Sequence, residues 1–314
     1  MTNSKIRVGI IGLGMVGDPL RKWFEERKGY IRGKDLFCFD IDKRKGYQDD
    51  INDADVIFVA VPTPSPKGGG ADLSILHQAV STIKDGKTVI IKSTVPPLTV
   101  ENLQKKYPLK RFIFSPEFLT ESQVWTDFVR PDRQILGPTE EGRRDVKEVL
   151  ALLPMAPFSR PWSSDYSKKE VTATEAELAK YASNVFGYIK VIYGNILADI
   201  SASLGITYDN VRDVISADPR IGPAWLDVEH GSYSGAGGFC FPKDMNALIA
   251  FVEKQLIPKT KDAGLKKSLK QGVNVLKSIR NYNRELLKWQ GLTEDGISTH
   301  DRDINTKKRK AIRN

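Results

Sequence analysis

The sequence contains few of the residues on which several classes of protein depend. Its 314 residues include only two cysteines, Cys38 and Cys240, which is too few for a disulfide framework and typical of a reducing cytoplasm. The three histidines, at positions 77, 230 and 300, have neither the spacing of a metal site nor a recognisable pairing with a serine. No run approaches the ~18 consecutive apolar residues of a membrane helix, and no signal peptide is recognisable. We therefore expect a cytoplasmic protein without a metal site or a membrane span.

The excess of positive charge is confined to one end of the chain. Overall, 40% of the residues are hydrophobic and 28% are charged, which is ordinary for a globular protein, and the length favours two domains over one. The net charge of +9 resides in residues 251–314, where 16 Lys and Arg stand against 7 Asp and Glu, whereas residues 1–250 are neutral. A basic end is more typical of solvated chain than of a nucleic-acid site, so charge gives no reason to expect a nucleic-acid partner.

The first half of the sequence alternates short apolar runs with amphipathic stretches. Apolar runs that are nearly continuous predict parallel strands with helices on both faces, which is a doubly wound α/β fold. The predicted strands are 5–12, 35–40, 54–61, 87–94, 111–115 and 133–137, and the predicted helices lie near 15–27, 72–83, 97–107 and 140–153.

The second half is predicted to be mostly helical. Apolar residues recur at helical spacing from 174 to 204, which predicts one long helix with more apolar positions than a single packing face requires. Further helices are predicted at 208–217, 244–257 and 262–290, with an aperiodic glycine-rich loop over 219–243. We therefore predict three parts, which are an α/β domain at 1–170, a helical domain at 171–292, and a basic, disordered tail at 293–314.

A glycine-rich turn follows the first predicted strand and opens the first predicted helix. Gly12, Gly14 and Gly17 form the G-x-G-x-x-G pattern, in which the glycines permit a tight turn and bring backbone amides close to a pyrophosphate. Asp40 ends the second predicted strand, where a carboxylate can accept hydrogen bonds from ribose hydroxyls and repel the 2′-phosphate of NADP. This arrangement predicts a Rossmann-like domain that binds NAD, although the three cations at 43–45 could also host a phosphate.

Three further groups of polar residues stand out. Cys240 lies in a glycine-rich loop directly before a predicted helix and near a lysine, and both features lower the pKa of a thiol. Glu117 and Glu121 follow a predicted strand at the edge where open α/β sheets bind their ligands. Lys180 and Asn184 are four residues apart, a spacing that by itself is more typical of a solvated helix face.

Together these residues form part of a longer series of motifs that resembles the UDP-glucose/GDP-mannose dehydrogenase family. Agreement of so many segments in one order is specific, whereas a glycine pattern alone is weak evidence. The matching segments are 12–17 with Asp40, 60–64, 71–74, 92–97, 115–121, 131–133, 176–184, 220–222 and 237–244.

The resemblance implies an NAD-dependent, four-electron oxidation of the C6 hydroxyl of a nucleotide sugar, with UDP-glucose to UDP-glucuronate as the expected reaction. Cys240 would capture the intermediate aldehyde as a thiohemiacetal, and a second oxidation would leave a thioester that water hydrolyses. Lys180, with Asn184 beside it, would stabilise the developing oxyanion and share in proton transfer, and Glu117 would act as general acid and base in the hydrolysis.

The resemblance also implies roles for the rest of the site. Asp244 would help to organise the hydrolysis site, and Thr94 would hold a water or the sugar hydroxyl. The long helix at 174–204 would pair two subunits into a homodimer. The implied cofactor contacts are Gly12, Gly14, Met15, Val16, Gly17, Asp40, Lys45, Thr63, Thr94, Glu121 and Lys243. The implied substrate contacts are Glu117, Phe118, Leu119, Glu121, Lys180, Asn184, Arg220 and Gly237.

Two departures from the family pattern keep other functions open. The usual C-terminal nucleotide-sugar-binding domain has no counterpart here, since residues 251–314 read as two helices and a polar tail. The loop between Gly222 and Gly237 holds 14 residues, and Ala236 stands where the family places an aromatic residue. One alternative is a two-electron dehydrogenase of the β-hydroxyacid type, which would not need Cys240. The other alternative is a catalytically lapsed NAD-binding or assembly protein.

Overall fold

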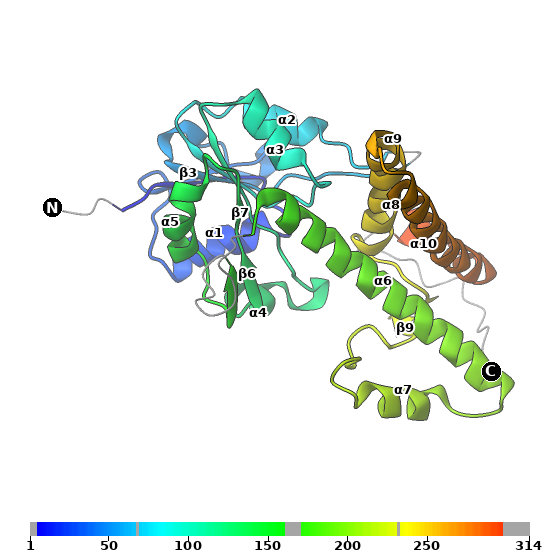
Figure 1. Cartoon of the computed structure of the whole chain (residues 1–314). Helices are drawn as coiled ribbons and strands as arrows, with labels where there is room; N and C mark the ends of the chain where they lie inside the picture. The colour runs from blue at the N-terminus through cyan, green and yellow to red at the C-terminus, as the bar shows by residue number, and fades with distance from the viewer. Residues whose placement is uncertain (1–4, 67–68, 161–170, 231–232, 298–314) are drawn as a thin grey trace. The chain divides into compact units, whose positions relative to one another are not determined.

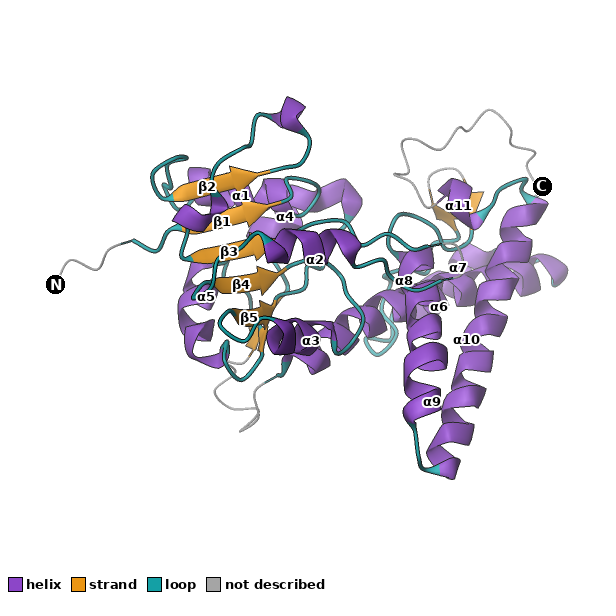
Figure 2. Ribbon diagram, turned by 90° about the horizontal axis from the view of Figure 1, so that it is seen from above, coloured by secondary structure: helices purple, strands orange, loops and turns teal. Residues whose placement is uncertain are grey.

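The predicted apolar runs form the strands of one sheet in the computed structural model, which describes residues 5–66, 69–160, 171–230 and 233–297. The strand order is β2-β1-β3-β4-β5-β7, and the first five strands are parallel. Figure 2 shows these parallel strands side by side. The strands are β1 Val8–Ile11, β2 Leu36–Phe39, β3 Val56–Val59, β4 Thr88–Ile91 and β5 Arg111–Phe114, with β7 Gly137–Pro138 antiparallel to β5.

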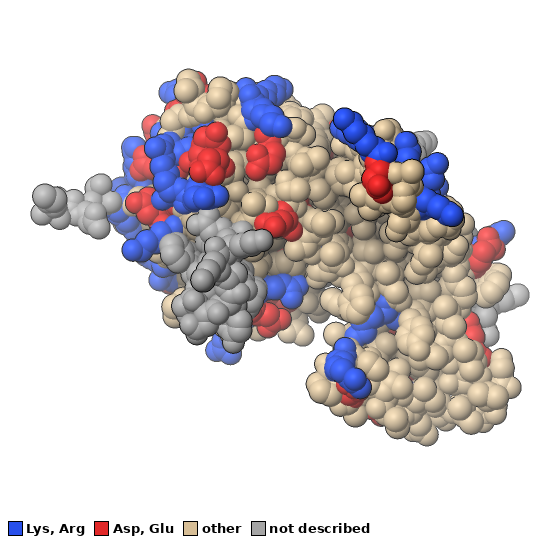
Figure 3. Space-filling view, viewed as in Figure 1, with Lys and Arg blue, Asp and Glu red and all other residues tan. Residues whose placement is uncertain are grey.

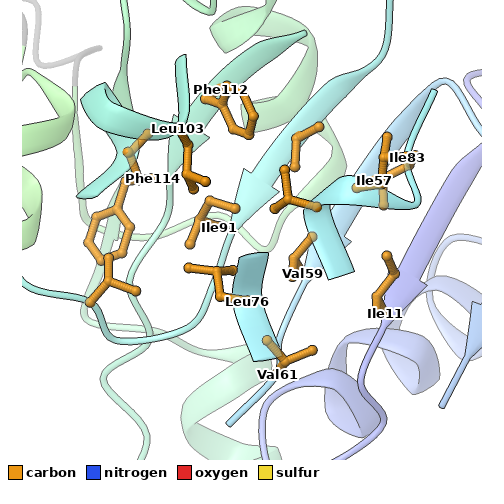
Figure 4. Packing of buried hydrophobic residues seen from close by; sticks show 14 of the residues in the cluster. Ile11, Ile57, Val59, Val61, Leu76, Ile83, Ile91, Leu103, Phe112 and Phe114 are labelled. Carbon is orange, nitrogen blue, oxygen red and sulfur yellow. The ribbon is translucent and has the colours of Figure 1, made fainter. Parts of the chain in front are cut away.

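Both faces of this sheet are covered by helices, as the fold-class prediction requires. One face packs under α2 Ser74–Ser81 and α3 Thr99–Lys106, whose Leu76 and Leu103 lie in one cluster with strand residues such as Ile91 (Figure 4). The other face packs under α1 Gly17–Glu26, α4 Val124–Val129 and α5 Val146–Leu152. Strands buried on both faces favour β-branched and aromatic residues, which explains runs such as that of Val56–Val59. The predicted α/β class is therefore confirmed.

The last part of this sheet differs from the prediction. The single strand expected at 133–137 is two short strands. The first, β6 Arg133–Ile135, pairs with β8 Phe158–Arg160 in a separate sheet, whereas β7 pairs with β5. The sequence prediction also missed β8 and α4, which are too short to show a period. Short 3-10 helices complete the unit: η1 Lys43–Lys45, η2 Ile51–Asp53, η3 Glu121–Gln123 and η4 Arg143–Asp145.

A long helix, α6 Ala173–Ser203, leads into the helical half of the chain (Figure 1). The chain divides into two compact units, Met1–Pro64 with Ala71–Lys180 and Ser65–Gly70 with Tyr181–Asn314, so the division falls within α6 rather than before it. The remaining helices are α7 Tyr208–Ser216, α8 Phe241–Phe251, a π-helical turn η5 Val252–Leu256, α9 Ile257–Lys259 and α10 Ala263–Trp289. None of the helices within the described residues combines the length and the apolar composition that a membrane span requires.

The second unit has its own core and two features that the sequence did not predict. Tyr188 and Ile192 of α6 pack with Met245 of α8 and Val273 of α10. The loop predicted at 219–243 contains a small antiparallel hairpin, β9 Glu229–His230 with β10 Tyr233–Ser234. A short helix, α11 Glu294–Ile297, lies inside the segment predicted as a disordered tail, and its Ile297 is fully buried, so that prediction is wrong for these residues. Residues 298–314 of the predicted tail lie outside the described residues.

Candidate active site

The glycine-rich turn between β1 and α1 has the geometry that a dinucleotide phosphate requires. Gly12 has a positive φ of 90°, and a Cβ atom on Gly17 would lie 1.8 Å from the carbonyl oxygen of Gly12, so both positions require glycine. A Cβ on Gly14 would meet no atom of the described residues within 4 Å, which leaves an open side where a ligand can approach the backbone. Val16 precedes the first turn of α1, whose amides are suited to bind an anion. With Met15, these predicted cofactor residues therefore form one loop that fits NAD.

Asp40 is tied to this turn by its own hydrogen bonds. One carboxylate oxygen accepts from the backbone N–H of Leu13 and from Lys45 Nζ, both at 2.8 Å, and the other accepts from the backbone N–H of Asp42. Burial would raise the pKa of Asp40, but these hydrogen bonds and the charge of Lys45 hold the pKa below its ordinary value. The ionised carboxylate repels a 2′-phosphate, and Lys45 is engaged with it, so the turn favours NAD over NADP.

The loops after β3, β4 and β5 are tied together at the carboxyl ends of the strands. The Thr63 hydroxyl donates to the carbonyl oxygen of Thr94 at 2.7 Å, and the Ser93 hydroxyl donates to the carbonyl oxygen of Val61 at 2.7 Å. Lys92 Nζ donates to Ser115 Oγ at 3.0 Å. Open α/β sheets bind ligands at this edge, which is where the predicted residues Thr63 and Thr94 lie.

Lys92 also forms an ion pair with Glu117, the carboxylate predicted to act in the hydrolysis. The Lys92 side chain is completely buried, and that of Glu117 is 13% exposed. This lysine opens the matching segment 92–97 but is not among the predicted site residues. Its sequence signal is its position, because a lysine directly after the buried strand β4 needs a partner of opposite charge.

The ring of Phe118, which follows Glu117 in the sequence, makes cation–π contacts with two side chains of the first unit. Phe118 lies with its ring centroid 3.7 Å from the Arg133 guanidinium carbon and 5.0 Å from Lys180 Nζ. Lys180 is buried, contrary to the solvated face that its spacing alone suggested. Leu119 packs on the opposite sheet face from Phe118, so the predicted substrate residues 118 and 119 contact different cores. Glu121 begins η3, and its side chain lies outside the described part of the structure.

Glu177, one turn before Lys180 in α6, is a fully buried carboxyl group. One oxygen accepts from the backbone N–H of Val100, in the first turn of α3, at 2.8 Å, and the other has no hydrogen-bond partner among the described residues. Burial raises the pKa of Glu177 from 4.5 to about 8, against the lowering effect of hydrogen bonds from the backbone of Val100 and Leu98. This carboxyl therefore joins α6 to the start of α3, the helix that follows the loop with Thr94.

Removing the charge of Glu177 should stabilise the protein at alkaline pH. Below pH 4.5 both folded and unfolded states are protonated, whereas between 4.5 and about 8 only the unfolded state ionises, so stability falls as the pH rises through this window. Glu177→Gln should remove that fall and raise the free energy of unfolding at pH 8 by about 1–3 kcal/mol. Urea unfolding from pH 5 to 9 measures this, with the exposed Glu148→Gln as the control that leaves the fall in place. An unchanged pH profile for Glu177→Gln would contradict the assignment.

In the second unit, the predicted nucleophile stands at the start of a helix. Cys240 is the N-cap residue of α8 and is exposed. Asp244, in the first turn, is completely buried, and its two oxygens accept from Asn184 Nδ2 and Lys243 Nζ, each at 2.5 Å. Asp244 thus contacts two other predicted residues, Asn184 and Lys243, and it fixes the amide of Asn184. Lys243, predicted as a cofactor contact, is held by Asp244.

The loop that leads to Cys240 is held by side-chain amides of α10. Asn283 donates to the carbonyl oxygen of Ala236 at 2.9 Å and accepts from its N–H at 2.8 Å, and Gln290 does the same for Ser234 at 2.8 Å each. The N–H of Gly238 donates to the carbonyl oxygen of Ile297 in α11 at 3.1 Å. Neither amide was predicted, because an Asn or Gln on a helix has no sequence signal for a distant backbone partner.

The two remaining predicted substrate residues differ in how firmly they are placed. Arg220 is 88% exposed and pairs only with its neighbour Asp218 among the interactions of the described residues, at 2.6 Å. A Cβ atom on Gly237 would lie 2.0 Å from the hydroxyl oxygen of Tyr233, so a glycine is required for the close approach of that ring. The predicted site residues are therefore divided, with Glu117, Thr94 and Lys180 in the first unit and the Cys240 group in the second.

Comparison with protein families identifies both halves of the chain. Residues 43–152 match the UDP-glucose/GDP-mannose dehydrogenase family, NAD binding domain, and residues 174–266 match the central domain of that family. The UDP-glucose 6-dehydrogenase of Pseudomonas aeruginosa is 37% identical over 219 residues, which cover 65% of this chain and 46% of that protein. UDP-glucose 6-dehydrogenase AglM of Haloferax volcanii is 34% identical over 225 residues, or 66% and 50%. The chain spans about half the length of the curated relatives it matches.

Solved structures share the fold at lower sequence identity. A UDP-glucose dehydrogenase from Pyrobaculum islandicum superposes with a TM-score of 0.69 at 24% identity and covers 90% of this chain and 69% of that chain. A 3-hydroxyisobutyrate dehydrogenase from Mycobacterium tuberculosis superposes with a TM-score of 0.59 at 13% identity and covers 90% and 96%. Both likenesses concern the fold alone, which two kinds of dehydrogenase share, so the reaction has to be argued from the residues.

Proposed function

The chain belongs to the UDP-glucose/GDP-mannose dehydrogenase family, and from this premise we propose that it oxidises the C6 hydroxyl of a nucleotide sugar, UDP-glucose first among them, to a carboxylate. One observation supports a four-electron oxidation over a two-electron one. An exposed cysteine, Cys240, is the N-cap of α8 and lies one turn before Asp244, which orients Asn184. A helix N-terminus favours a thiolate, and a thiolate can hold an aldehyde until it is oxidised again.

In the proposed mechanism, the glycine-rich turn and Asp40 would hold NAD, which would supply the hydride acceptor for both oxidations. Cys240 attacks the aldehyde carbon, and the resulting thiohemiacetal oxygen carries developing negative charge. Lys180 and Asn184 supply an ammonium and an amide for that charge, and both are buried in their own units, where such groups act more strongly than in water. Glu117 then removes a proton from the water that hydrolyses the thioester, while Asp244 holds Asn184 in position.

The remaining predicted residues have supporting roles in this proposal. Thr94 would hold the attacking water or the sugar hydroxyl. Phe118, Arg220 and Gly237 would contact the substrate, with Leu119 and Glu121 beside them. The cytoplasmic location stays a prediction that rests on the low cysteine content.

Counting NADH decides between this reaction and its alternatives. With UDP-glucose limiting and NAD in excess, the proposed reaction yields two NADH for each sugar consumed. One NADH per sugar would instead favour a two-electron dehydrogenase of the β-hydroxyacid type, in keeping with the fold shared with 3-hydroxyisobutyrate dehydrogenase. No NADH from UDP-glucose or from GDP-mannose would favour a lapsed NAD-binding or assembly protein.

The exposed face of α6 supports a homodimer as the partner arrangement. Phe186, Tyr193 and Ile200 are spaced seven residues apart, so they share one face of the helix, and all three are exposed. Figure 3 shows few charged side chains on the visible face over α6 and α7. Exposed apolar residues in a continuous row are typical of an interface between subunits.

A charge on this face should separate the subunits. Phe186→Asp would place a carboxylate in the apolar interface and should weaken dimerisation by about 100-fold, while the fold is retained because the side chain is exposed in one subunit. Sedimentation equilibrium measures the shift, and Leu265→Asp on the exposed side of α10 is the matched control. A wild-type protein that is monomeric at tens of micromolar, or a Phe186→Asp variant that dimerises as well as wild type, would refute the proposal.

A further inference from the structure

We propose that Lys92 is a positioning residue for Glu117, which it holds as an ionised, oriented carboxylate for the hydrolysis of the thioester. The inference rests on the proposed function and adds a residue to it. It starts from the ion pair between Lys92 Nζ and Glu117 Oε1 and from the hydrogen bond of Lys92 to Ser115.

The burial of Lys92 shows that its ammonium group depends on these partners. Its side chain is completely buried, and an ammonium group in that position is costly unless it is paired and hydrogen-bonded. Both described interactions of its side chain go to one short segment, since Ser115 follows β5 directly and Glu117 is two residues further. A contact that served only packing would not require a charge at this position.

The pairing of β4 with β5 explains why Lys92 orients the Glu117 carboxylate as well as neutralising its charge. Lys92 follows β4 directly, and β4 is hydrogen-bonded to β5 in parallel register. The lysine therefore joins the ends of two adjacent strands. Because its backbone is fixed at the end of β4, its side chain limits the positions that the Glu117 carboxylate can adopt. The loop after β4 also carries Thr94, whose carbonyl oxygen is bound by Thr63, so the lysine belongs to a segment that is fixed on both sides.

An ion pair exists only with an ionised carboxylate, and that is the form a general base needs. In the hydrolysis, the water oxygen forms a bond to the acyl carbon and its proton passes to Glu117. The carbon–sulfur bond then breaks, and its electron pair leaves with Cys240 as a thiolate. No electrons pass to or from NAD in this step, so a defect in Lys92 should spare both oxidations and slow only the release of the acid.

The test compares Lys92→Met, Glu117→Gln and the double variant in rapid mixing with UDP-glucose and NAD. Lys92→Met keeps the length of the side chain without its charge. We expect it to release two NADH per active site in a burst and then to turn over about 100-fold more slowly than wild type, with KM changed by less than about threefold. A simply misfolded variant would lose the burst together with the steady-state rate.

The double variant keeps the test decisive if Lys92→Met folds poorly. The double variant leaves no uncompensated buried charge, so it should fold. If Lys92 acts through Glu117, the steady-state rate of the double variant should equal that of Glu117→Gln alone. A double variant that is slower still by tenfold or more, about 1.4 kcal/mol, would overturn the proposal, as would a Lys92→Met variant with the wild-type steady-state rate.

Thermal unfolding without substrate separates the ion pair from the reaction. Lys92→Met should lower Tm by about 5 °C or more, and addition of Glu117→Gln should restore at least half of that loss. The absence of this rescue would refute the pairing itself. A wild-type protein that forms no NADH would refute the proposed function and the catalytic part of this inference together, while the rescue would still establish the pair.

Discussion

Cys240→Ala is expected to abolish formation of the acid, with a loss of at least about 10³-fold in the rate at which a second NADH appears. Without the thiol, no thiohemiacetal forms, so an aldehyde produced by the first oxidation is neither held nor converted to a thioester. The measurement is NADH per nucleotide sugar at completion, together with alkylation of the wild-type protein by iodoacetamide and identification of the modified residue by mass spectrometry.

Cys38→Ala is the matched control for the loss of a thiol. Cys38 is fully buried in β2, and burial raises the pKa of its thiol to about 12, so it is protonated at neutral pH and should resist alkylation. This variant should keep two NADH per sugar. Two NADH from Cys240→Ala would rule out the thioester route, and one NADH from both the wild type and Cys240→Ala would move the protein to the two-electron alternative.

Gly17→Ala is expected to have the largest effect on the fold and on NAD binding together. A Cβ atom at this position would lie 1.8 Å from the carbonyl oxygen of Gly12, and no L side chain can be accommodated there without moving the turn between β1 and α1. We expect a loss of about 3 kcal/mol or more in the free energy of unfolding and no measurable NAD binding. Chemical denaturation and calorimetric titration with NAD measure the two effects.

Gly14→Ala separates binding from folding in the same loop. A Cβ atom at Gly14 would meet no protein atom within 4 Å, so stability should stay within about 0.5 kcal/mol of wild type. The added methyl group would occupy the side from which a pyrophosphate approaches the backbone, and the Kd for NAD should rise by about tenfold or more. If Gly14→Ala bound NAD as tightly as wild type, the phosphates would have to bind elsewhere, and equal stability of Gly17→Ala would show that the turn can relax.

Local sequence was sufficient where one residue's requirement is set by its neighbours along the chain. The order of apolar runs determined the five parallel strands, because a strand buried on both faces has to be apolar throughout. The glycine spacing determined the turn at 12–17, since the steric demand at Gly17 comes from Gly12, five residues away. Ordered motifs then indicated the family, which the matches to both of its domains confirmed.

Local sequence failed where elements are short or where partners are distant. The segment 133–137 has a strand-like composition, yet it divides between β8 and β5, because pairing of so few residues is decided by which edges are available. The short helix α11 was missed for a related reason, since four residues show no period and are stabilised by burial of Ile297.

The sequence by itself therefore determined the fold class and the NAD turn, and it supplied the residues to which the proposal assigns chemistry, because each depends on residue type and close spacing. Only the tertiary structure decided how those residues are held. Lys92 pairs with Glu117, which is 25 positions away in the sequence. Glu177 binds the start of α3 across 77 positions, and Asn283 binds the loop before Cys240 across 47 positions. Such contacts depend on which strands and helices become neighbours, and that follows from burying apolar surface across the whole unit rather than from any local pattern.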